Sequence, residues 1–249
     1  MKKSVIGWTV AAILAIGGAA FAYLFWFAGG SGEPTTDLTT PPVADATTTS
    51  SSTSDTSASG SDTTAGGSEV VAFVIDPGQS VARFELDEVL RGEDTHVVGT
   101  TDQVVGQVQV DLSDLAGAEF SEIIVNARTF TTGAEQRDRA IRGPVILDSA
   151  SDANELITFS VTSVDGLSGG ISSGETVEFA ITGDLTVKGT TRAVTFDASV
   201  TMVDDSTIEG MAVTEITRDM FEIGIPSVPS VADVTNEVLI ALDFVAVAG

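Results

Sequence analysis

The chain has 249 residues, of which 36 are acidic and 11 basic, and its formal net charge is −25. So negative a chain repels the phosphates of nucleic acids, which proteins bind through Lys and Arg, and this argues against a nucleic-acid partner. The chain has no cysteine, which excludes disulfides and thiol chemistry. Its single histidine, His96, is too little for a catalytic triad or a histidine metal centre. We therefore expect neither an enzyme nor a resident metal or cofactor.

The first element is an uncharged apolar run from Val5 to Ala28, preceded by Lys2 and Lys3. The run is long enough to cross a hydrocarbon core about 30 Å thick as a helix. The positive-inside rule then places the tip, residues 1–4, in the cytoplasm and the rest of the chain outside. We therefore predict a signal anchor over residues 5–28 and a single-pass cell membrane protein. The alternative is a secreted protein, because the segment 20–22 resembles a signal-peptidase site.

Residues 29–68 form the second element, a stretch rich in Ser, Thr, Gly, Asp, Ala and Pro that contains no base and no aromatic residue. Such a composition buries too little apolar surface to offset the entropy of the chain, so we predict a disordered linker. As a flexible coil the linker would span about 35 Å root-mean-square. It would act as a plain spacer or as a stalk between the membrane and a folded domain.

Residues 69–249 form the third element, in which apolar and polar residues alternate with a period of two. Within Thr176–Val187, for example, Phe179 and Ile181 fall on one face and Glu178 and Thr182 on the other. This alternation predicts strands with one buried face. Similar runs occupy residues 104–112, 157–161, 193–202 and 237–247. Short turn signals separate them, so an antiparallel all-β domain of about eight to ten strands is expected, as either a sandwich or a barrel.

A short helix is predicted at Ala134–Arg142, with Thr132 as its candidate N-cap. This helix carries several of the chain's few cations, among them Arg137 and Arg142. Asp138 and Arg142 are spaced i, i+4 and are expected to pair on its surface. A salt-bridged helix of this kind would close one end of the domain.

Several blocks of this domain, at consistent spacing, resemble the YceI-like family. The most recognisable is RTFTTGAEQRDRAIRG, Arg128–Gly143. The others are Phe73–Leu86, Val97–Leu112, residues 155–164 and residues 181–196. The similarity extends over nearly all of Phe73–Val247. The resemblance implies an eight-stranded, lipocalin-like antiparallel β-barrel with an apolar tunnel, in an exported protein that carries or stores polyisoprenoid lipids such as isoprenoid quinones.

This resemblance and the alternation together predict the binding site. The apolar lining is expected to consist of Phe84, Ile157, Phe159, Phe179, Ile181, Phe196, Leu242 and Phe244. Arg137 and Arg142 either form part of a local clasp or face the mouth and bind a polar head group through their planar guanidinium forks. A solid-cored surface module without a lipid is the alternative function. A homodimer, and the roles of His96 and Arg218, stay open.

Overall fold

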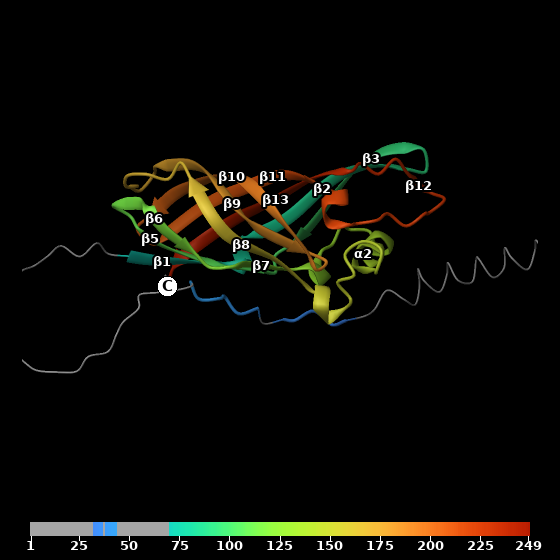
Figure 1. Cartoon of the computed structure of the whole chain (residues 1–249), viewed down its shortest axis with the longest axis horizontal. Helices are drawn as coiled ribbons and strands as arrows, with labels where there is room; N and C mark the ends of the chain where they lie inside the picture. The colour runs from blue at the N-terminus through green and yellow to red at the C-terminus, as the bar shows by residue number, and fades with distance from the viewer. Residues whose placement is uncertain (1–31, 37, 44–69) are drawn as a thin grey trace, which may run out of the picture.

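The computed structural model describes residues 32–36, 38–43 and 70–249. The predicted signal anchor and most of the predicted linker lie outside these residues. Across the described ranges, no helix is long and apolar enough to cross a membrane. Strands joined by short turns make up most of the described chain (Figure 1).

Thirteen strands belong to one sheet, accompanied by one α-helix and four 3-10 helices in the described part of the chain. The strands are β1 (Val70–Ile75), β2 (Val81–Leu90), β3 (Glu93–Thr101), β4 (Val104–Val105), β5 (Gln107–Asp111), β6 (Asp114–Phe120), β7 (Ile123–Asn126), β8 (Leu156–Asp165), β9 (Thr176–Val187), β10 (Thr190–Asp204), β11 (Thr207–Thr217), β12 (Val231–Ala232) and β13 (Glu237–Ala248). The helices are η1 (Pro77–Gln79), η2 (Ala127–Thr129), α2 (Glu135–Arg142), η3 (Asp152–Asn154) and η4 (Arg218–Phe221).

Every pairing in this sheet is antiparallel. From β7 the order runs through β8, β9, β10 and β11 to β13, which pairs with both β1 and β2. Strand β1 also pairs with β5, which pairs with β6. Strand β2 also pairs with β3, and β4 pairs with β7. The sheet therefore curls round on itself in the manner of a lipocalin-like barrel. The prediction of eight strands was too low because some stretches are divided into short segments, such as β4 and β5 on either side of Gly106.

Three phenylalanines of the interior each lie against a glycine of the neighbouring strand. A Cβ atom at Gly99 would come within 2.2 Å of the Phe84 ring, and one at Gly183 within 2.7 Å of the Phe159 ring. A Cβ atom at Gly210 would come within 2.8 Å of the Phe244 ring. The glycines thus provide the space in which rings lie flat against the wall of the barrel.

This close approach predicts a cost for adding one methyl group at Gly183. A Cβ atom there would also lie 2.4 Å from the backbone oxygen of Ser160. Because neither a backbone nor a packed ring yields easily, we expect Gly183→Ala to lower the free energy of unfolding by about 1–3 kcal/mol. Gly117→Ala is the matched control, since nothing lies within 4 Å of its Cβ position. Equal denaturant midpoints for the two variants would contradict the packing argument.

Helix α2 confirms the helix predicted at this position, but Thr132 does not cap it. The N-cap is Ala134, which makes no side-chain capping hydrogen bond. Instead, the carboxylate of Asp138 accepts hydrogen bonds from the amide and hydroxyl of Thr132, at 2.8 and 2.6 Å, and from the hydroxyl of Thr131 at 2.9 Å. Burial opposes ionisation of Asp138, but these bonds and the charge of Arg142 together lower its pKa. Asp138 therefore anchors the chain that leads into the helix.

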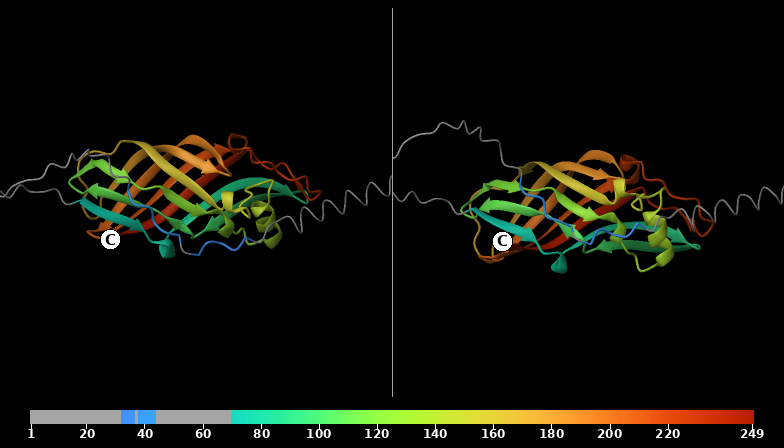
Figure 2. Two further views of the ribbon diagram at one scale, coloured as in Figure 1. Left: turned by 60° about the horizontal axis from the view of Figure 1, so that its bottom comes forward. Right: turned by 90° about the horizontal axis from the view of Figure 1, so that it is seen from below.

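Residues 32–43 do not behave as the predicted disordered linker where the structure describes them. They run along the outside of the barrel from the α2 end toward the end where the C-terminus lies (blue in Figures 1 and 2). The amide of Thr35 donates to Glu155 Oε1 at 2.6 Å, and Gln107 Nε2 donates to the carbonyl of Pro41 at 3.0 Å. Composition alone missed this segment because its bonds are made by backbone groups to partners far along the chain. We call residues 32–36 and 38–43 the strap.

Candidate functional site: an apolar cavity inside the barrel

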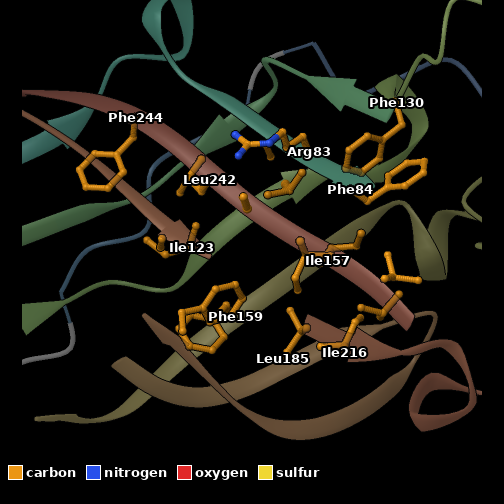
Figure 3. A pocket seen from close by; sticks show the side chains of 18 of the residues that line it. Arg83, Phe84, Ile123, Phe130, Ile157, Phe159, Leu185, Ile216, Leu242 and Phe244 are labelled. Carbon is orange, nitrogen blue, oxygen red and sulfur yellow. The ribbon is translucent and has the colours of Figure 1, made fainter. Parts of the chain in front are cut away.

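A cavity of about 650 Å³ occupies the interior of the barrel. This volume falls within the range of about 300–1,000 Å³ that is usual for small-molecule sites. Its walls are almost wholly aliphatic and aromatic (Figure 3). Buried apolar clusters continue the lining at both ends, one around Phe221 and Leu185 and one around Phe73 and Met202.

All eight residues predicted as the apolar lining border this cavity. They are Phe84, Ile157, Phe159, Phe179, Ile181, Phe196, Leu242 and Phe244. Two edge-to-face contacts order the rings. Phe159 and Phe196 lie with centroids 5.0 Å apart, and Phe84 and Phe130 with centroids 5.3 Å apart. In Figure 3, Phe84 and Phe130 lie together at one end of the view and Phe244 at the other. Their contact with a ligand stays a prediction.

The α2 end of the cavity carries an ion pair, while other polar lining residues, such as Arg83 and Gln107, lie elsewhere along its walls. Arg137 Nη2 donates to Glu88 Oε1 at 2.8 Å, and both residues border the cavity. The Glu88 side chain is 9% exposed and that of Arg137 23%. This poorly hydrated ion pair places fixed charge at one end of a mainly apolar space. A guanidinium has five N–H donors, so one bond to Glu88 leaves donors for a second acceptor.

Arg142 does not border the cavity, so the geometry does not support its predicted contact with a head group, which stays a prediction. Its Nη1 points to the backbone carbonyls of Phe130 and Arg128, at 3.4 and 3.5 Å. The reason is the helical spacing: Ile141 faces the cavity from the last turn of α2, so its neighbour Arg142 turns toward the η2 segment. The clasp interpretation therefore describes Arg142.

Arg218 borders the cavity while holding a wall segment in place. Its Nε donates to the carbonyl of Thr235 at 2.7 Å, and its Nη2 to that of Val234 at 3.1 Å. Its Nη1 approaches the carbonyl of Ile223 at 3.3 Å. These bonds fix both ends of the segment 223–235, which lines the cavity through Pro226 and Val228 among others. Arg218 is thus a structural residue at the α2 end.

Several lining residues were missing from the sequence-based prediction. Phe130, Ile146, Ile223, Ile225 and Val228 all border the cavity, yet none belongs to a strand. Alternation finds only residues within strands, and loops have no period to detect. Phe130 alone had a signal, since it lies within the block that resembles the family motif.

A cluster of buried polar side chains lies outside the cavity, beneath the strap. Arg128 is 5% exposed, Glu155 7% and Asn126 fully buried. Arg128 Nη1 donates to Glu155 Oε2 at 2.8 Å, and Asn126 Nδ2 donates to Glu155 Oε1 at 3.0 Å. Burial opposes ionisation of Glu155, but hydrogen bonds from Thr35 and Asn126 and the charge of Arg128 lower the pKa of its carboxyl. We call Asn126, Arg128 and Glu155 the polar cluster.

His96 lies on the outer face of β3, away from the cavity. Its Nδ1 is 2.8 Å from Asp87 Oδ1 and its Nε2 is 3.1 Å from Glu85 Oε2. The hydrogen bonds with Asp87 and Glu85 raise the pKa of His96. Since its side chain is 55% exposed, His96 serves as a surface partner of two carboxylates.

Comparison with known proteins places this geometry in a family. The family model described as YceI-like domain matches residues 73–246. BcnA from Burkholderia cenocepacia is 21% identical, with a TM-score of 0.53 over 69% of this chain and 98% of that one. A polyisoprenoid binding domain from Saccharophagus degradans, implicated in plant cell wall breakdown, is 12% identical, with a TM-score of 0.54 over 72% of this chain and 99% of that one.

At these identities the two structures establish similarity of fold alone. No curated protein matches the sequence. The family model, by contrast, covers more than half of the chain and includes every strand from β2 to β12. The chain therefore belongs to the YceI-like domain family.

Proposed function

We propose that this protein binds a long-chain isoprenoid lipid, of the quinone or polyprenyl type, inside the barrel and outside the cytoplasm. The observation that carries the proposal is the apolar cavity of about 650 Å³. Family membership supports it, since one related fold is described as a polyisoprenoid binding domain. Burial of an apolar chain stabilises the complex by about 25 cal/mol per Å² of surface removed from water, before ordering costs are subtracted. The proposal gives the barrel a binding role without catalysis.

A solid-cored interaction module is the competing function. It requires the inward side chains to fill the barrel, as they fill ordinary protein interiors. A cavity of this size inside the barrel weighs against that alternative. The predicted anchor over residues 5–28 would hold the binding domain at the membrane that contains such lipids.

Native mass spectrometry tests the proposal. The chain from Gly29 to Gly249, which retains the strap, is exported by a bacterium that makes isoprenoid quinones and purified without detergent. We expect one isoprenoid molecule per chain, identified after extraction. A lipid-free protein that also refuses added isoprenoid quinone would overturn the proposal and favour the interaction module.

The polar end of the cavity predicts a head-group effect at Arg137. Replacing Arg137 with Met removes a charged donor, worth about 1.5–3 kcal/mol per hydrogen bond, or roughly 10–100-fold in affinity. We expect this loss for an isoprenoid quinone and little change for a polyprenyl hydrocarbon without a head group, both measured by competition binding.

Two variants control for side effects of that change. The double variant Arg137→Met, Glu88→Gln removes the carboxylate that would otherwise be left without its Arg137 partner. It should show the same selective loss of affinity for the quinone, with little change for the polyprenyl hydrocarbon. Arg142→Met removes a guanidinium that does not border the cavity and should bind both lipids as the unaltered chain does. Equal losses for both lipids in Arg137→Met would contradict head-group contact.

A further inference from the structure

The strap is bound to the barrel by groups that recognise its backbone. Arg128 Nη1 donates to the carbonyl of Glu33 at 3.1 Å, and Asn126 Nδ2 donates to that of Thr35 at 3.2 Å. A Cβ atom at Gly32 would lie 2.7 Å from Arg128 Cζ and 2.8 Å from the oxygen of Ala150. The first residue of the strap thus lies directly on the guanidinium of the polar cluster.

The polar cluster lies at the α2 end of the barrel. Arg128 belongs to η2, which immediately precedes Phe130 in the cavity wall. The side chain of Arg142, in the last turn of α2, points to the backbone of this same segment. Figures 1 and 2 show the strap beginning beside α2 in each view. The chain therefore first meets the barrel at the end of the cavity that carries Glu88 and Arg137.

Without the strap, the chain would first meet the barrel at the opposite end. The first strand starts at Val70, which pairs with Asp111 beside the β5–β6 turn. The strand β9 has 12 residues, which at about 3.3 Å per residue separates the two ends by roughly 40 Å along the strand. The strap therefore determines which end is connected to the N-terminal part of the chain.

We propose that the strap holds the α2 end of the barrel, and with it the polar end of the cavity, against the membrane. This inference rests on the proposed function, in which residues 5–28 are the anchor. Only residues 29–31 then separate the anchor from Gly32, which is at most about 14 Å of extended chain. A free linker of residues 29–68 would span about 35 Å and would impose no orientation. Lipid would pass directly between the bilayer and the cavity.

Energy transfer from single-cysteine variants to the membrane surface tests this orientation. The chain contains no cysteine, so Glu135→Cys on α2 and Asp205→Cys in the β10–β11 turn each accept one donor dye. Each full-length variant is reconstituted into vesicles of phosphatidylcholine and phosphatidylglycerol with an acceptor on the lipid head groups. We expect markedly stronger transfer from position 135 than from position 205.

A strap variant provides the decisive comparison. Gly32→Leu should force the strap off Arg128 and leave the barrel unchanged, whereas Thr36→Leu adds the same side chain at an exposed position. We expect Gly32→Leu to abolish the difference between positions 135 and 205, and Thr36→Leu to preserve it. Hydrogen exchange at the Thr35 amide reports docking independently, and should accelerate in Gly32→Leu alone.

Two results would overturn the proposal, and they differ from each other. Equal transfer from positions 135 and 205, in a chain whose Thr35 amide is protected, would show that the docked strap does not orient the barrel. Failure of the full chain to float with the vesicles would overturn membrane anchoring and orientation together. Lipid retention by the chain from Gly29, measured by native mass spectrometry, tests the proposed function independently of both results.

Discussion

Ile181→Asp is expected to abolish lipid retention. Ile181 is 8% exposed and borders the cavity from the middle of β9. A bound isoprenoid chain would strip water from the new carboxylate, and an unpaired buried charge costs several kcal/mol even after relaxation. That cost corresponds to more than about 100-fold in affinity. The lipid recovered from the purified variant, relative to the unaltered chain, measures the loss.

Two further variants separate this effect from general damage. Thr182→Asp adds the same charge one residue later, on the outer face, where Thr182 contacts Thr195, and should retain lipid. Ala198→Phe adds bulk to a cavity-lining residue without charge, and should also expel lipid. Circular dichroism establishes that each variant is folded. If folded Ile181→Asp and Ala198→Phe both keep their lipid, the cavity is not the binding site.

Arg128→Ala is expected to destabilise the domain severely. The side chain of Arg128 donates five hydrogen bonds, to Glu33, Ser149, Ala150, Asp152 and Glu155. Its removal leaves Glu155 as a buried carboxylate without its cation, which typically costs about 3–5 kcal/mol. For a domain of this size, we expect Tm to fall by about 10 °C or more. Thermal unfolding followed by circular dichroism measures this change.

Arg192→Ala is the matched control for that experiment. Arg192 is exposed, with its Nη1 on the carbonyl of the adjacent Thr191, so the same change of charge should shift stability by no more than about 0.5 kcal/mol. Arg128→Lys should fall between the two, because it keeps the charge and loses the planar fork. Similar melting temperatures for Arg128→Ala and Arg192→Ala would show that the polar cluster does not hold the fold.

The strands and the inward faces were predictable because half-buried strands impose a period of two on the sequence. Phe179 and Ile181 were assigned to the interior on this pattern, and both border the cavity. Helix α2 was likewise predictable from its local composition. Segments without a period were not. The wall segment between Ile223 and Thr235 has no such pattern. Its position depends instead on three hydrogen bonds from Arg218, which local sequence does not reveal.

The different fates of Arg137 and Arg142 show where local reasoning ends. Both lie on one short helix, five residues apart and so on different faces, but the helix by itself does not show which of the two faces meets the cavity. The distinction comes from Glu88, nearly fifty positions earlier in the chain, whose carboxylate faces Arg137 at 2.8 Å. Contacts between residues so far apart exist only after the sheet has curled.

The sequence by itself determined the strands, their inward faces and the apolar character of the interior, because these follow from the alternation of neighbouring residues. The tertiary structure alone decided the size of the cavity in the interior, the pairing of Arg137 with Glu88 at its α2 end, and the docking of the strap on the barrel. Each of these depends on how far apart the walls stand and which distant backbone groups meet. A carbonyl such as that of Glu33 looks like any other in the sequence, and only the fold brings Arg128 to it.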